Sequence, residues 1–279
     1  MKLSIITINY NNAEGLRKTL ASVAAQTYAN IEHIIVDGGS TDGSVEVIRD
    51  YSQSPIANSH EIRWISEKDK GIYNAMNKGI LMATGEYIQI LNSGDILFDA
   101  SVTQQMIERL DQISSLREEK IGILYGNMTK VNAAGQVVGK SGYTEYSLRQ
   151  FYSSTLNHDC AYLRKDLFEE YGLYDEQLKI VSDWKWYLQT IGLGRVKPEY
   201  VDIDVTIFDD GGISETNLAL RNSERRKVLE ELLPPAVLWD YDTHAFEMEQ
   251  MKRLRRWHLY GLVWFIERVC FKFEKWFVN

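Results

Sequence analysis

The chain has 279 residues, of which 44% are hydrophobic and 25% charged, and its formal net charge is −8. This length and composition are ordinary for a folded globular protein with a large core, and the acidic balance argues against nucleic acid as the main partner. The two cysteines, Cys160 and Cys270, form neither a CxxC pair nor a Cys/His zinc spacing, so they indicate no disulfide scaffold or metal knuckle.

In the first hundred residues, strand and helix patterns alternate. We predict strands at 3–8, 31–36, 62–65 and 86–91, and helices at 13–26, 45–51 and 72–82. Strands separated by helices of this length indicate parallel βαβ units, and right-handed crossovers bring the carboxyl ends of such strands to one edge of the sheet. Ligands of open α/β sheets bind at that edge. The polar residues that end these strands are Thr7, Asn9, Asp37, Glu67, Asp69, Asn92 and Asp95.

The second half is less regular. We predict strands at 121–125, 160–163 and 201–208, a β-hairpin over 126–140, and helices at 184–191 and 215–233. The last of these helices stops at Pro234-Pro235, a typical boundary. We therefore predict a catalytic domain over 1–233, with halves 1–100 and 101–233, followed by a helical extension over 234–279.

A glycine-rich turn follows the strand that ends in Asp37, and a helix start follows the turn. A carboxylate at a sheet edge, beside Gly38 and Gly39 with little side-chain bulk, suits recognition of a nucleotide base or ribose. The alternative is an ordinary strand–turn–helix in which the aspartate caps the turn.

Three further positions carry candidate chemistry. Asp95 is the candidate ligand of Mg²⁺ or Mn²⁺, which bind through one or two carboxylates plus substrate phosphates, although an Asx turn would use the same residue. Asp183 is the candidate general base, or else a helix N-cap above an aromatic face. His158 and Trp184 are candidates for contact with acceptor or phosphate, and each also fits an ordinary core position.

Five segments, taken in order, closely resemble the GT-A-fold family 2 glycosyltransferases of bacterial polysaccharide and cell-envelope synthesis. These segments are Ser4–Asn12, Val36–Ser44, Ser66–Gly79, Gly85–Tyr87 and Leu91–Asp95, and the resemblance continues more loosely to about residue 215. It implies a Rossmann-like, mostly parallel α/β sheet flanked by helices. It also implies an inverting, metal-dependent sugar transferase that uses a nucleotide-diphosphate sugar.

Carried over residue by residue, the resemblance implies that Asp37 contacts the donor base and that Asp69, with the Lys70-Gly71 turn, lies beside the nucleoside. It also implies that Asp95 holds the metal and that Asp183 is the base. We expect the remaining donor contacts from Thr7, Asn9, Gly38, Asn92, Ser93 and Gly94. Asn92 and Gly94 stand where the family often has aspartate, and Ser182 stands where a glutamate often precedes the base. These departures leave Asp95 as the only direct carboxylate ligand expected on the metal.

The end of the chain is basic, with seven Lys or Arg against two Glu between 252 and 279. From Leu259 onward apolar residues recur every three or four positions, but the longest apolar run, 257–266, is too short to span a bilayer. We expect an amphipathic helix that lies on an anionic membrane surface, or alternatively one that packs on its own domain or a partner subunit.

Three functions are compatible with these patterns. The leading one is sugar transfer from a nucleotide-diphosphate sugar to a hydroxyl of a saccharide or lipid-linked acceptor. The second is a catalytically inactive nucleotide-sugar-binding or scaffolding protein with the same fold. The third, a nucleotidyltransferase, is disfavoured because the first turn, Asn9–Asn12, is not a glycine- and lysine-rich phosphate loop. No signal-peptide pattern precedes the first strand, so we expect a cytoplasmic protein, peripheral on the inner face of the membrane.

Overall fold

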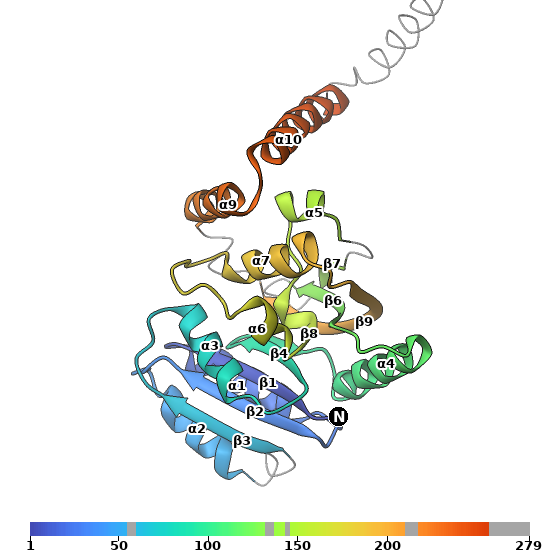
Figure 1. Cartoon of the computed structure of the whole chain (residues 1–279). Coiled ribbons are helices and arrows are strands. Elements are labelled where there is room, and N and C mark those ends of the chain that lie inside the picture. The colour runs from blue at the N-terminus through green and yellow to red at the C-terminus, as the bar shows by residue number, and fades with distance from the viewer. Residues whose placement is uncertain (55–59, 132–136, 143–145, 210–216, 257–279) are drawn as a thin grey trace, which may run out of the picture. The chain divides into compact units, whose positions relative to one another are not determined.

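The computed structural model describes residues 1–54, 60–131, 137–142, 146–209 and 217–256 (Figure 1). The chain divides into two compact units, Met1–Arg225 and Arg226–Asn279. The first unit holds nearly all the strands and helices that we predicted, and it contains both cavities described below.

A single mixed sheet forms the centre of the first unit, with strand order β3-β2-β1-β4-β8-β6-β9-β5 and β7 paired to β6. Strands β1, β2, β3 and β4 are mutually parallel, as the βαβ pattern predicts, whereas β8 is antiparallel to both β4 and β6. The strand bounds are β1 Leu3–Asn9, β2 Ile31–Asp37, β3 Glu61–Ser66, β4 Tyr87–Asn92, β5 Ile96–Leu97, β6 Ile123–Val131, β7 Val137–Ser141, β8 Ala161–Arg164 and β9 Pro198–Asp209.

Helices cover both faces of the parallel half. Helices α1 (Ala13–Ala24) and α2 (Ser44–Gln53) pack on one face around a small apolar cluster that includes Leu16, Ile35 and Ile48. Helix α3 (Ile72–Met82) covers β1 and β2 on the other face, where a Cβ on Gly79 would lie 2.3 Å from Ile6. Each helix therefore starts close to the carboxyl end of the strand before it.

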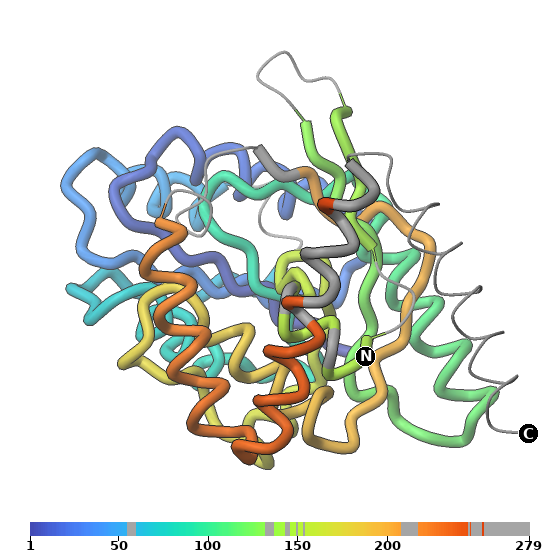
Figure 2. The backbone as a smooth tube through the Cα atoms, turned by 90° about the horizontal axis from the view of Figure 1, so that it is seen from above, coloured from blue at the N-terminus to red at the C-terminus, as the bar shows by residue number. Residues whose placement is uncertain are grey.

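The second half of the first unit contains the antiparallel strands and several short helices. The predicted hairpin is confirmed, because β6 and β7 run side by side (Figure 2). The helices of this half are α4 Val102–Arg117, α5 Leu148–Ser153, η2 His158–Cys160, α6 Leu167–Tyr171, α7 Ser182–Tyr187 and the π-helix η3 Leu188–Leu193. Helix α4 was not predicted. Pairing of β6 with β9 in parallel, and of β5 with β9, closes the sheet on this side.

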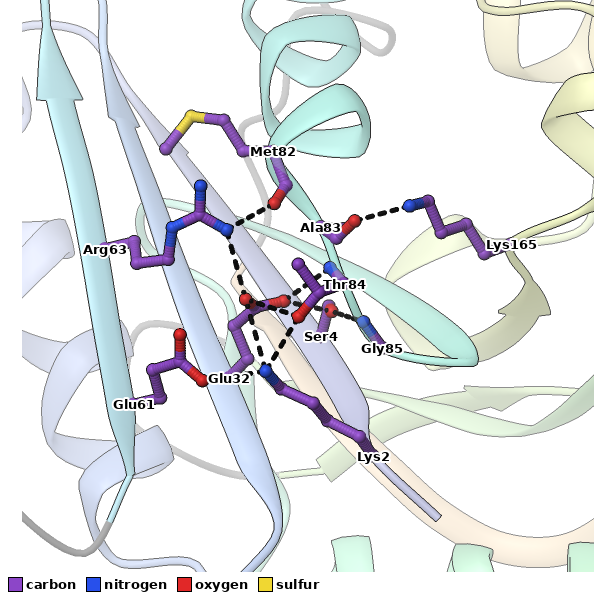
Figure 3. A network of polar contacts seen from close by, with 10 residues as sticks. All are labelled: Lys2, Ser4, Glu32, Glu61, Arg63, Met82, Ala83, Thr84, Gly85 and Lys165. Carbon is purple, nitrogen blue, oxygen red and sulfur yellow. Dashed lines mark hydrogen bonds and ion pairs between the residues drawn. The ribbon is translucent and has the colours of Figure 1, made fainter.

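A buried carboxylate lies at the amino-terminal edge of the sheet, far along β2 from the predicted site. The side chain of Glu32 is 0% exposed, and one of its oxygens accepts hydrogen bonds from the Ser4 hydroxyl (2.6 Å) and the Thr84 amide (2.8 Å) (Figure 3). Lys2 and Arg63 supply positive charge to the other oxygen. Burial opposes ionisation, but these hydrogen bonds and Lys2 outweigh it and lower the pKa of Glu32 to about 2.

Two helices follow the sheet. Helix α9 (Leu218–Leu232) ends just before Pro234, as predicted, and α10 (Pro235–Arg256) begins with a proline in its first turn, where its missing N–H costs nothing. The apolar stripe that we predicted from Leu259 onward lies outside the described residues. Among the residues that the structure describes, no helix combines the length and apolar character needed to cross a bilayer.

Candidate active site

Two cavities open at the carboxyl edge of the sheet, and they share two lining residues. The first cavity, of about 750 Å³, is bounded by the ends of β1, β2 and β4 and by the start of α3. The second, of about 300 Å³, lies between β4, η2, the residues before α7, and α9. Ile72 and Asn92 line both. The two spaces are therefore adjacent, and Asn92 stands where they meet.

The first cavity has a floor of backbone and a rim of side chains. Gly38 forms part of the floor, where an added Cβ would lie 3.0 Å from an Asp69 oxygen and 3.1 Å from the Tyr10 ring, so only glycine fits without displacing them. Tyr10 is 68% exposed at the rim, and Asp69 is held by the ammonium group of Lys78. Six of the residues predicted to contact the donor line this cavity, namely Asn9, Gly38, Asp69, Lys70, Asn92 and Ser93.

Asp37 lies behind this floor instead of in the cavity. Its side chain is fully buried, and its two oxygens accept five hydrogen bonds, from Asn9, Gly39, Ser66 and both the hydroxyl and the backbone of Ser40. Burial opposes ionisation, but these donors outweigh it and lower the pKa of the Asp37 carboxyl. Direct contact with a base would require Asp37 to give up one of these donors. In this structure its carboxylate fixes the shape of the turn.

Two other predicted donor contacts are also displaced from the first cavity. The Thr7 hydroxyl is buried 3.0 Å from Nε2 of His33, which gives it no direct route to a ligand in the cavity. Gly94 has a positive φ of 115°, which favours glycine, and its amide donates to Thr19. Thr7 and Gly94 therefore make hydrogen bonds within the protein that support the site, and they are not among the residues that line the cavity.

Asp95 and Asp159 form a buried acidic pair in the second cavity. Both side chains are nearly inaccessible to solvent, and the Thr206 hydroxyl donates to Asp159 at 2.7 Å. Burial, together with the charge of Asp159, raises the pKa of Asp95 to about 7. His158 offsets part of this negative charge but also pairs with Asp183, so a bound cation would relieve the repulsion that remains.

The donor set fits a hard divalent cation bound largely by its substrate. Within the described residues, no three His, Cys, Asp or Glu side chains are grouped so as to hold a metal ion. The carboxylate of Asp95 and the amide oxygen of Asn92, which is buried with no hydrogen-bond partner in the described part of the chain, are oxygen ligands of the type that Mg²⁺ and Mn²⁺ prefer. A diphosphate would complete the coordination.

Asp183 is held at the opposite wall of the second cavity by two side chains. The Tyr73 hydroxyl donates to Oδ1 at 2.8 Å, and Nδ1 of His158 lies 3.3 Å from Oδ2. Burial opposes ionisation of Asp183, but His158 and Tyr73 outweigh it and lower its pKa, so the carboxylate is ionised at neutral pH. A positioned, ionised carboxylate beside a cavity can accept a proton from a bound hydroxyl.

His158 connects the two sides of the second cavity. Its Nε2 lies 3.1 Å from the amide nitrogen of Asn92, and its pKa is raised to about 9 because the Asp183, Asp159 and Asp95 carboxylates outweigh the opposing effect of burial. The neutral ring can accept from the Asn92 amide at Nε2 while Nδ1 donates to Asp183, whereas the protonated ring donates from both nitrogens and needs the Asn92 oxygen as the acceptor for Nε2. The orientation of the amide and the protonation of the ring are therefore coupled.

Trp184 is a fully buried, packed residue. Its indole nitrogen donates to the carbonyl of Phe151 at 2.6 Å, and the Arg225 guanidinium lies over the ring, 5.0 Å from its centre. It lines the second cavity, but Arg225 covers a face that a sugar would need for stacking. Sequence reasoning did not single out Tyr10, Tyr73, Asp159, Arg221 or Arg225 as lining residues. Tyr10 lies inside the Asn9–Asn12 turn, Tyr73 inside the Ser66–Gly79 segment and Asp159 next to His158, and these positions were the available signals.

With this geometry established, comparisons with known proteins identify the family. The model of glycosyl transferase family 2 matches residues 4–172 of the chain. The chain belongs to this family. It is 32% identical over 191 residues to an uncharacterized glycosyltransferase of Mycobacterium tuberculosis, covering 67% of this chain and 68% of the relative. It is 24% identical to a PGL/p-HBAD biosynthesis glycosyltransferase of Mycobacterium bovis, over 76% of this chain and 79% of the relative.

Solved structures show the fold of this family 2 glycosyltransferase. TarS of S. aureus (residues 1–349) in complex with UDP-GlcNAc is similar with a TM-score of 0.60 and 19% identity, over 76% of this chain and 59% of that one. The mannosyltransferase PcManGT of Pyrobaculum calidifontis, in complex with GDP-Man and Mn²⁺, is similar with a TM-score of 0.59 and 16% identity, over 80% and 61%. The chain thus spans about three fifths of the length of these structures. The predicted GT-A fold is confirmed.

Proposed function

We propose that this glycosyltransferase moves a sugar from a nucleotide-diphosphate sugar in the first cavity to a hydroxyl of an acceptor in the second, with inversion at the anomeric carbon. The observation that carries the proposal is the position of Asn92, which lines both cavities and contacts both Asp95 and His158. A sugar at this junction would have the candidate metal ligand on one side and the candidate base on the other.

The first cavity suits the nucleoside. The exposed ring of Tyr10 offers a face for stacking a base, a contact worth about 1–3 kcal/mol. The backbone of Gly38 and Gly39 allows close approach, and Asp69 and Lys70 supply polar contacts at the rim. In this proposal Asp37 acts through the turn that it holds.

The junction suits the diphosphate. Asp95 and Asn92 would hold Mn²⁺ or Mg²⁺, which when bound neutralises charge on the leaving nucleoside diphosphate. The backbone of Ser93 lies at the same point, fixed by a hydrogen bond from the Asn12 side chain to its carbonyl (2.8 Å). The relative that was solved with Mn²⁺ supports a divalent metal in this fold.

The second cavity suits the acceptor. Asp183 would accept the proton of the acceptor hydroxyl while that oxygen forms its bond to the anomeric carbon and the bond to the diphosphate breaks. One displacement with the base and the leaving group on opposite sides of the sugar inverts the anomeric configuration, the geometric logic of inverting glycosidases. Tyr73 and His158 hold the carboxylate in its ionised form.

The wider setting follows from the relatives. A relative named for PGL/p-HBAD biosynthesis supports a role in synthesis of a cell-envelope glycan. In this proposal the acceptor is a saccharide or lipid-linked saccharide, the protein works in the cytoplasm, and the basic stretch 252–279 contacts the anionic inner face of the membrane. Domain bounds of 1–233 and 234–279 remain our proposal for the functional division.

A donor panel tests the proposal. Thermal unfolding is measured with UDP-, GDP- and dTDP-sugars, each with and without Mn²⁺, since a ligand that binds only the folded state raises its apparent stability. We expect one base to raise the unfolding temperature more than the others, more strongly with Mn²⁺, and the matching sugar nucleotide to release nucleoside diphosphate. An unchanged unfolding temperature with every donor would contradict the proposal and favour a non-catalytic role.

A further inference from the structure

The second cavity carries positive charge that sugar transfer to a neutral hydroxyl does not require. Its lining includes Lys130, Lys179, Arg221 and Arg225 in addition to His158. Three carboxylates, those of Asp95, Asp159 and Asp183, line the same space. A chain with a formal net charge of −8 thus concentrates an excess of basic side chains in one cavity of about 300 Å³.

Helix α9 is fixed so that its basic residues reach this cavity. Glu224 is almost fully buried, and its two oxygens accept hydrogen bonds from the backbone amides of Lys179 (2.8 Å) and Ile180 (2.9 Å). These residues lie just before Asp183. Arg221 and Arg225, three residues before Glu224 and one after it, are therefore held in register with the candidate base.

The two arginines lie one helical turn apart on the same side of α9. Like charges at this spacing destabilise a helix, and burial together with Arg221 lowers the pKa of Arg225. Within the described residues, Nε of Arg225 is buried and has no hydrogen-bond acceptor, while its guanidinium plane rests on Trp184. An anion would offset the repulsion and use this donor.

We propose that Arg221 and Arg225, with Lys179 at the rim, form a subsite for an anionic group of the acceptor, a phosphate or a carboxylate carried next to the reacting hydroxyl. Guanidinium groups bind both kinds of anion through paired N–H donors. The inference rests on the proposed function, because it takes the second cavity as the acceptor side.

The position of these residues favours the acceptor over the donor. None of the four basic residues lines the first cavity, where Lys68 and Lys70 are the basic residues among the described lining. Arg225 and Asp183 line the same cavity, and the Arg225 guanidinium lies over the ring of Trp184, the residue that follows Asp183. An anion bound there would bring the adjacent hydroxyl to Asp183.

Binding of small probes tests the subsite without turnover. Glucose 1-phosphate, glucuronate and glucose are titrated by calorimetry into the full chain, alone and saturated with the nucleoside diphosphate that most raises its unfolding temperature. We expect binding of one or both anionic probes, with glucose much weaker, and binding that persists when the nucleotide is present. The stronger of the two anions identifies phosphate or carboxylate chemistry.

Variants assign the binding to α9. Arg225→Gln should weaken the preferred probe by about tenfold or more, the loss expected for a charge-assisted hydrogen bond, while Lys227→Gln, an exposed change on the same helix, should leave it unchanged. If Arg225→Gln does not fold, the same probe titration is carried out on Lys179→Gln, a change at the exposed rim of the cavity. No binding by the unaltered chain, equal binding by Arg225→Gln, or loss of binding on nucleotide saturation would overturn the proposal, and the last result would assign the arginines to the donor diphosphate.

The two proposals fail separately. If no nucleotide binds, the donor proposal fails, but the difference between Arg225→Gln and Lys227→Gln still reports on the anion subsite. If nucleotides bind and nucleoside diphosphate is released, but the probes do not bind, the transferase stands and only the acceptor subsite is wrong.

Discussion

A carboxylate is buried at each edge of the sheet, and the surroundings shift the pKa values of the two carboxyl groups in opposite directions. At the amino-terminal edge, Glu32 is surrounded by Ser4, Thr84, Lys2 and Arg63, and its pKa is lowered to about 2 (Figure 3). At the carboxyl edge, Asp95 shares a cavity with Asp159, and burial together with the charge of Asp159 raises its pKa to about 7. The first charge is neutralised by Lys2 and Arg63, whereas Asp95 shares one cation, His158, with Asp159 and Asp183.

The difference separates a structural cluster from a functional one. A satisfied buried charge holds elements together, and here it joins β1, β2 and the turn between α3 and β4. A buried acidic pair that is only partly compensated reduces stability, and such perturbed groups are typical of sites completed by a ligand. Charge-removing substitutions at the two edges should therefore change stability in opposite directions.

The largest effect on stability is expected at the amino-terminal edge. Glu32→Gln should lower the free energy of unfolding by about 3 kcal/mol, because it leaves Lys2 and Arg63 without their buried partner. Since the pKa is about 2 in the folded chain and near 4.5 otherwise, this stabilisation is complete above about pH 4.5 and is lost as the pH falls towards 2. Urea denaturation at pH 7 and pH 3 measures it.

A matched variant controls this experiment. Glu61→Gln removes the exposed carboxylate that also pairs with Lys2 and should cost at most about 1 kcal/mol. Equal effects of Glu32→Gln and Glu61→Gln would show that the buried network is not what stabilises this edge.

Asp37 combines features of Glu32 and Asp95. Its carboxylate is fully hydrogen-bonded, like that of Glu32, but it lies at the carboxyl edge of the sheet, like that of Asp95. Asp37→Asn replaces one acceptor with an NH₂ group facing its former donors and should cost about 2 kcal/mol of stability. Nucleotide affinity should fall as the turn loosens. A variant with normal stability and no nucleotide binding would instead show that Asp37 touches the base directly.

The smallest change in stability, and one of opposite sign, is expected for Asp95. In metal-free buffer, Asp95→Asn should raise the free energy of unfolding by about 1 kcal/mol, because the carboxylate beside Asp159 is removed. The same variant should lose the additional stabilisation that Mn²⁺ gives to the nucleotide complex. Asp111→Asn, on the exposed side of α4, is the control. A destabilised Asp95→Asn that still responds to Mn²⁺ would contradict the functional role of this edge.

The parallel half of the fold could be predicted because local patterns determine it. The periodicity of 3–8, 31–36 and 86–91 indicates strands, and βαβ connection rules then predict that they are parallel, with their carboxyl ends at one edge. The pairing of β6 with β9 could not be predicted, because paired residues such as Ile123 and Pro198 are far apart in the sequence and the hydrophobic pattern of a strand does not identify its partner. Helix α4 was missed because no motif marks it.

Some residues of the candidate site could be predicted from the sequence, and others could not. Asp95 and Asp183 are found by motif and by their place at element ends. Tyr73 is not, because its hydroxyl meets a carboxylate 110 residues away, and only the packing of α3 brings them together. The sequence also cannot show that Asp37 is saturated by five donors, since Ser66 and Asn9 come from neighbouring strands.

The most direct test of the account is the turnover of Asp183→Asn. Nucleoside diphosphate release at saturating donor is measured beside donor binding in the same preparation, with Asp111→Asn as the control. We predict donor binding within about twofold of the unaltered chain and release reduced by about 1,000-fold, as expected when a general base is lost. Near-normal release by Asp183→Asn would contradict the assignment of the base and, with it, the division of the cleft into donor and acceptor sides.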